Sequence, residues 1–193
     1  MKSFESTALI ALIASAAACF AAYLITAKVI PNAAWLDKIG QRLYQQKIAQ
    51  LSKPPLIYYQ NALDRDDLAT GFMIIVLGIL LKSIVSFAIG ILAIFLLPIG
   101  VATIPTLVRQ FGDGPQLHHW ASAVTALQTS SHLLAACIGF SATWLWIRDG
   151  SSPLKSIAEA PQFSFVILLA SVVVGIVAAW VETDGHFRRG FLP

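Results

Sequence analysis

Long apolar runs separated by polar segments dominate the pattern of this chain. Four of them cover about residues 6–30, 71–97, 120–147 and 163–181. Each is long enough for a bilayer-spanning helix, which needs about 20 mostly apolar residues. The pattern predicts an all-α, polytopic integral membrane protein, with residues 1–193 forming a single membrane domain of four transmembrane helices.

Helix-breaking residues mark the expected ends of the first three runs. Pro31 follows the first run, Pro98 closes the second, and Gly150 follows the third. Residues 98–105 remain apolar, but eight residues are too few to cross a bilayer. We expect this stretch to lie near the membrane interface and not to form a fifth crossing.

Residues 33–51 have the periodicity of an amphipathic helix. The apolar and polar positions fall on opposite sides of a helix: Leu36, Ile39, Leu43 and Leu51 against Asp37, Lys38, Gln41, Arg42 and Gln45. Such a basic helix fits the anionic membrane surface. Packing on a neighbouring subunit explains the periodicity equally well.

Composition agrees with a membrane location. The chain is 57% hydrophobic and only 12% charged, and its mean hydropathy is +0.74. These values exclude a disordered chain, a nucleic-acid-binding module and a secreted disulfide scaffold. The expected partners are the lipid bilayer and other membrane-protein subunits or further copies of the chain, with no nucleic acid.

The distribution of basic residues predicts an orientation. Lys and Arg are more frequent in the first and third connections than in the second connection and at the two ends, and such an excess marks the cytoplasmic side. Four spans would place both termini on one face. We therefore expect a protein of the bacterial inner (cytoplasmic) membrane with both termini extracytoplasmic.

Lys82 lies deep within the second predicted span. At 1.5 Å per residue it is about 16 Å from Gly71, near the bilayer midplane. A charge there costs at least about 2.5 to 3.5 kcal/mol, and none of the ten Asp and Glu residues falls within a predicted span. We expect Lys82 to contact a polar group of the third span, an acidic group of another molecule or a ligand. The alternative is that it snorkels to the headgroups.

Polar and small residues form one stripe on the third predicted span. Within about 120° of arc lie Ser122, Thr125, Gln128, Thr129, His132, Ala136, Gly139 and Thr143. His132 is at a depth similar to that of Lys82, and Ser86 shares the Lys82 face of the second span. The two faces either hold the helices together through hydrogen bonds and close approach or line a hydrated path that moves ions or protons.

Histidines suggest two further sites. An even number of spans would place His118, His119 and His186 on one side, where Asp184, Asp113 or Glu182 could add an oxygen ligand for zinc or copper. We expect these histidines to lie too far apart to share a metal. His132 could ligate haem, but no other predicted span contains a histidine, so a second histidine ligand would come from another subunit.

Three classes of function fit these patterns. Small residues recur at helical spacing on three spans, which favours packing against helices of other chains, and the first class is a non-catalytic transmembrane subunit of a larger membrane complex. The second is a small oligomeric transporter or ion- or proton-conducting protein that uses Lys82 and the stripe around His132. The third is a metal- or haem-dependent membrane redox enzyme subunit. No catalytic motif is present in the sequence.

Overall fold

The computed structural model of the chain describes residues 4–29, 34–51, 53–54, 56–111 and 115–189. Over these residues the secondary structure is helical throughout, without a strand. Four of the described helices are long and apolar enough to cross a membrane. This confirms the predicted all-α class and the predicted number of candidate spans.

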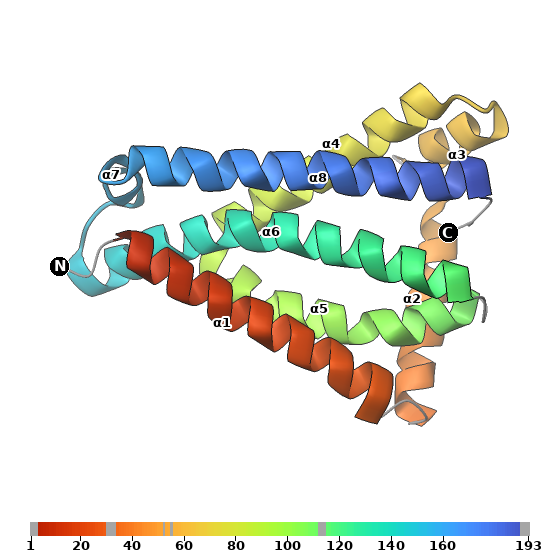
Figure 1. Cartoon of the computed structure of the whole chain (residues 1–193), viewed down its shortest axis with the longest axis horizontal. Helices are drawn as coiled ribbons and strands as arrows, with labels where there is room; N and C mark the ends of the chain where they lie inside the picture. Colours follow the sequence, from red (N-terminus) through yellow and green to blue (C-terminus); the bar gives the residue numbers. More distant parts are fainter. Residues whose placement is uncertain (1–3, 30–33, 52, 55, 112–114, 190–193) are drawn as a thin grey trace.

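The first apolar run and the amphipathic segment form helices as predicted. The run forms α1 (Phe4–Leu24), which continues as a π-helix, η1 (Ile25–Val29); Pro31 lies outside the described residues. The amphipathic segment forms α2 (Ala34–Leu51), which crosses one end of the long helices (Figure 1). There α2 packs on α5, and a Cβ at Gly40 would lie only 2.9 Å from the carbonyl oxygen of Thr106.

A short helix precedes the second apolar run. This helix, α3 (Leu56–Asp64), packs against α4 (Leu68–Ala88). Asp67 caps α4, since its carboxylate accepts hydrogen bonds from the backbone nitrogen and the hydroxyl of Thr70, at 3.1 and 2.6 Å. Carboxylates at this position satisfy amides that have no partner within the helix.

The second predicted span differs from the structure. α4 ends at Ala88, and a separate helix, α5 (Gly90–Phe111), continues through both Pro98 and Pro105. The prediction that Pro98 ends a helix is therefore wrong, because residues 98–105 are helical; their location near a membrane interface stays a prediction. The physical reason lies on α1. A proline leaves the carbonyl four residues earlier without its helical donor, and Ser15 Oγ donates to the carbonyl of Ile94 at 3.2 Å.

The third and fourth apolar runs form the two longest described helices. They are α6 (Pro115–Asp149) and α8 (Pro161–Arg189), joined through the short α7 (Pro153–Ala158). Gly150 ends α6 as predicted; its φ of +71° is a conformation that glycine adopts without strain.

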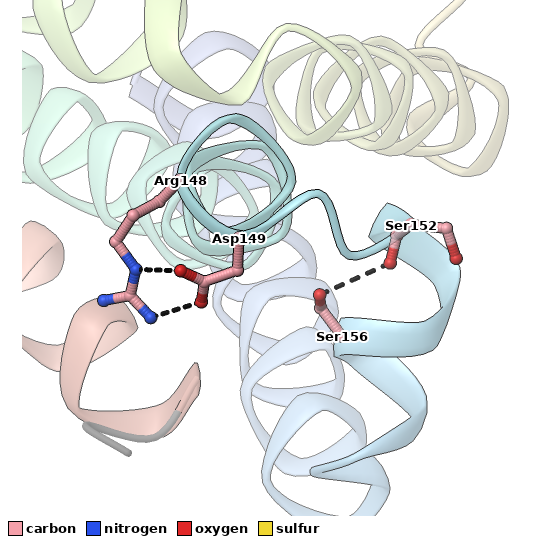
Figure 2. A network of polar contacts seen from close by, with 4 residues as sticks. All are labelled: Arg148, Asp149, Ser152 and Ser156. Atoms are coloured by element: carbon pink, nitrogen blue, oxygen red, sulfur yellow. Dashed lines mark hydrogen bonds and ion pairs between the residues drawn. The ribbon is translucent and has the colours of Figure 1, made fainter.

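The connection after α6 is held by local polar contacts. Figure 2 shows Arg148 and Asp149 in an ion pair at the end of α6, and Ser156 Oγ donating to the carbonyl of Ser152 at 3.3 Å. Ser152 also caps α7 through the backbone nitrogen of Lys155. The Ser152 contacts cap the start of α7, the short helix between α6 and α8.

α6 is the central helix of the bundle. Of 18 consecutive, mostly apolar residues in its candidate span, 61% are buried. The corresponding share is 17 to 28% in the other three candidate spans. α1, α4, α5 and α8 all pack against it (Figure 1). Most of α6 therefore faces protein, apart from a strip with exposed His119, Ala123, Ala126 and Ser130 and its last turns, whereas the other long helices each expose a broad apolar face.

The turn between α4 and α5 packs against α6 where two glycines, Gly90 and Gly139, meet. A Cβ on Gly139 would overlap the carbonyl oxygen of Phe87, and a Cβ on Gly90 would overlap the backbone of Gly139. Only glycine permits backbones to approach this closely. This helix crossing sets the position of the turn along α6.

α5 changes the relation between the two ends of the chain. It runs back along the bundle, so the beginning of α1 and the end of α8 lie at opposite ends of the long axis (Figure 1). The sequence-based prediction of both termini on one face assumed a single crossing over residues 71–97. That assumption does not hold in this fold.

Candidate functional site

A buried polar network joins α4, α6 and α8 at the centre of the bundle. Ser83 Oγ of α4 is hydrogen-bonded to His132 Nδ1 at 3.0 Å and to Ser131 Oγ at 3.1 Å. Ser131 Oγ also lies 2.8 Å from the carbonyl oxygen of Ser171, and Ser171 Oγ donates to the carbonyl of Ser131 at 2.8 Å. All four side chains are at least 91% buried. The network links three helices through hydroxyl and imidazole groups.

Lys82 lies beside this network, on the exposed side of α4, and its charge acts on His132 electrostatically. Its side chain is exposed, while Ser83 takes the position facing His132. The described residues provide Lys82 with neither a hydrogen bond nor an ion pair. The hypothesis that Lys82 acts together with His132 remains a prediction, as does the hypothesis of a contact with another molecule.

Gln128 joins α6 to an acidic residue of α8. Its Nε2 donates to Glu182 Oε2 at 2.6 Å. α8 continues as a helix to Arg189, so Glu182 and Asp184 fall inside the candidate span Pro161–Arg188. The expectation that no carboxylate lies within a span is therefore corrected. The prediction differed because the apolar run ends at Val181, whereas the helix continues to Arg189.

Aromatic and histidine side chains pack between α3 and the long helices. Tyr59 Oη of α3 is hydrogen-bonded to His186 Nδ1 of α8, and both side chains are buried. Trp120 packs on His186 with ring centroids 5.1 Å apart, and its Nε1 donates to the carbonyl of Val181 at 2.9 Å. Burial raises the pKa of Tyr59, and the nearby Glu182 raises it further.

The candidate metal ligands are placed as follows. His119 is exposed, and the side chain of His118 lies outside the described part of the structure. His186 is bound to Tyr59, and Asp184 forms an ion pair with Arg188 at 3.3 Å. Among the described residues no group of three His, Cys, Asp or Glu side chains is placed to hold a metal ion.

The remaining predicted site residues line cavities beside α6. Thr125 and Thr129 border a cavity of about 380 Å³ between α1, α5 and α6. Ser86 is buried and, together with Thr129, borders a cavity of about 230 Å³ between α4, α5 and α6. The polar stripe of α6 therefore faces four different surroundings: the two cavities, α4 at His132 and α8 at Gln128.

The residues that sequence reasoning missed are small or aromatic. Ser83, Ser131 and Ser171 carry the central network, and Tyr59 carries the contact from α3. One signal was present, since Ile79, Ser83 and Ser86 have the 4- and 3-residue spacing of a single helix face. The sequence-based prediction instead assigned Lys82 to the inward face of this helix, and so did not identify Ser83.

Comparisons with protein families, with curated proteins and with solved structures find no match to this chain.

Proposed function

We propose that the chain is a non-catalytic transmembrane subunit of a larger membrane complex and that it binds its partner through the outer face of α4. One observation carries this proposal: Lys82 is exposed at the level of the bundle centre.

The depth of Lys82 follows from the residue beside it. Ser83 is hydrogen-bonded to His132, which lies 13 residues after His119 and 17 before Asp149 in the candidate span of α6. At 1.5 Å per residue these separations are about 20 and 26 Å. Relative to the α6 span, Lys82 is therefore at about mid-depth; on α4 itself it lies 14 residues after Leu68 and 6 before Ala88.

The surroundings of Lys82 are apolar. Leu81 and Ile84, its neighbours on α4, are both 63% exposed, and Val85 is exposed as well. A charged group on such a face costs at least about 2.5 to 3.5 kcal/mol at the membrane centre. A carboxylate or amide from another protein would offset this cost, because it would pair with the ammonium group in a low-dielectric environment.

We also propose an orientation that differs from the sequence-based one. Most described basic residues outside the bundle centre lie at the end that carries α2, where Lys28, Lys38, Arg42, Lys53, Arg65, Arg109 and Arg188 are found; Arg148 and Lys155 lie at the other end (Figure 1). This supports a cytoplasmic location for the α2 end and for the end of α8.

The test of the subunit proposal compares three variants of the full chain purified from native membranes in mild detergent. Lys82→Met removes the charge and keeps an apolar stem, Lys82→Arg retains a cation, and Lys155→Met removes an exposed lysine of α7. Quantitative mass spectrometry then measures which membrane proteins accompany each variant.

We expect one set of membrane proteins to accompany the unchanged chain, Lys82→Arg and Lys155→Met, and to be lost with Lys82→Met. Insertion of Lys82→Met should be unimpaired, because the cost of burying the charge is removed. Companions that are equally abundant with Lys82→Met, or the absence of any stoichiometric companion, would contradict the proposal.

Ion or proton conduction by an oligomer is a second candidate. The observation that favours it is the hydrogen-bonded network of Ser83, Ser131 and His132, because titratable groups buried in membrane helices mark proton and ion paths. Flux measured in proteoliposomes tests it. His132→Ala should abolish flux, whereas Thr143→Ala, at another level of α6, should not.

A further inference from the structure

We propose that the space between α1, α5 and α6 binds one anionic membrane lipid, with an acyl chain in the larger cavity and the headgroup beside Arg109. This inference goes beyond the subunit proposal and rests only on its premise that the helices lie in a bilayer. It uses neither Lys82 nor the outer face of α4.

The larger cavity has the size and lining of a site for an apolar chain. Its volume is about 380 Å³, within the range of ligand pockets in proteins. Its walls are mostly apolar, with Cys19 and Phe20 on α1, Val101 on α5, and Ala126 and Leu133 on α6. Phe20 and Ala126 are exposed at its border, so the cavity opens sideways between α1 and α6.

A polar pair closes one end of this cavity. Tyr23 Oη and Ser122 Oγ are hydrogen-bonded at 2.9 Å, and both residues also line a second cavity of about 170 Å³. The second cavity is bordered by Val108 and by Arg109, whose side chain is half-buried. Tyr23, Ser122 and Arg109 therefore lie at one end of the space, while the hydroxyls of Thr125, Thr129 and Ser130 border its mostly apolar part.

The order of these groups matches an amphiphile lying along the bundle axis. Leu133 and Ser122 are 11 residues apart on α6, or about 16 Å, close to the hydrocarbon thickness of one leaflet. Arg109 lies beyond Ser122, at the end of the bundle where the other basic residues gather (Figure 1). A lipid in that leaflet would place its anionic headgroup at this cation.

A helix from another chain does not fit this space. A helix with its side chains is about 10 to 12 Å across, whereas the larger cavity has a volume of only about 380 Å³. An uncharged apolar ligand would use the cavity but not Arg109. Charge complementarity at one end and apolar walls at the other therefore favour an anionic phospholipid.

The test is native mass spectrometry of the full chain in mild detergent with phosphatidylglycerol or phosphatidylcholine of identical acyl chains. Arg109→Gln removes the cation, and Arg65→Gln is its control, an exposed arginine outside both cavities. Ala126→Trp fills the larger cavity, and Ala123→Trp is its control on an exposed position of α6. Thermal unfolding confirms that each variant is folded, and inorganic phosphate is added as a competitor.

We expect one phosphatidylglycerol to be retained more tightly than phosphatidylcholine. Arg109→Gln should reduce this preference about fivefold, the effect of about 1 kcal/mol per basic residue at a membrane surface, and Ala126→Trp should abolish retention of both lipids. The two controls and Lys82→Met should behave as the unchanged chain. Equal retention of both lipids, retention by Ala126→Trp, or complete displacement by phosphate alone would overturn the proposal.

Discussion

Tyr59 of α3 and His186 of α8 form a buried hydrogen bond between residues 127 positions apart in the sequence. Tyr59 is 3% exposed and His186 is 6% exposed. Tyr59 also packs on the ring of Phe187, with centroids 6.3 Å apart. α3 is only nine residues long, too short to be stable alone, so these contacts hold it in place.

Removing the tyrosine hydroxyl should loosen α3. Tyr59→Phe keeps the ring and deletes the group bonded to His186 Nδ1, and loss of one partner of a buried hydrogen bond costs about 1 to 3 kcal/mol. We expect a lower midpoint of thermal unfolding in detergent. Tyr58→Phe is the control, because Tyr58 is 58% exposed. An equal midpoint for the two variants would show that the bond contributes little.

The same tyrosine should make stability fall at high pH. Burial, followed by the charge of Glu182, raises the pKa of Tyr59 above its ordinary value of 10.0. Below about pH 10 the phenol is neutral in both states, and its contribution is fully present. Above that value the unfolded chain loses the proton first, so stability declines as the pH rises toward the folded pKa. Unfolding midpoints measured from about pH 8 to 11 should decline less for Tyr59→Phe than for Tyr58→Phe.

A methyl group at the helix crossing should be strongly destabilising. Gly139→Ala would place its Cβ against the backbone of Phe87, and overpacking of this kind typically costs about 1 to 3 kcal/mol or more. Gly78→Ala on α4 is the matched control, since nothing lies within 4 Å of its added Cβ. There the better helix propensity of alanine should stabilise by up to about 1 kcal/mol. Similar unfolding midpoints for both variants would contradict the crossing.

Labelling from the two sides of sealed vesicles tests the proposed orientation. Single cysteines are introduced at Lys38, Arg188, Glu5 and Ser152, in a chain whose Cys19 and Cys137 are replaced by alanine. Lys38 and Arg188 lie at the end of the bundle that carries α2, and Glu5 and Ser152 at the other (Figure 1). We expect the first two to react only from the cytoplasmic side and the last two only from the opposite side. Reaction of Arg188 and Ser152 from the same side would refute this arrangement.

The predicted helices were most accurate where the deciding contacts are local. The apolar runs gave α1, α6 and α8, and the amphipathic period gave α2 almost to the residue. Gly150 ended α6, because a residue with positive φ stops a helix whatever surrounds it. These features depend on neighbours within one or two turns, which a single sequence displays.

The candidate site was predicted only in part, because facing directions are set by packing. His132, Gln128 and Thr129 do lie on inward or cavity-lining faces of α6. On α4, however, the inward position belongs to Ser83, one residue and about 100° away from Lys82. Hydropathy shows that α4 is apolar but cannot show which side meets α6.

Length and apolarity, which are sums over consecutive residues, settled that this chain is a helical bundle with four candidate spans. The path of α5 was decided by tertiary contacts. The turn before it depends on Gly139 of α6, and the carbonyl of Ile94, freed by Pro98, is bound by Ser15 of α1, 79 residues away. A proline removes the helical donor of that carbonyl. The donor here belongs to another helix, so only the folded chain shows that α5 continues.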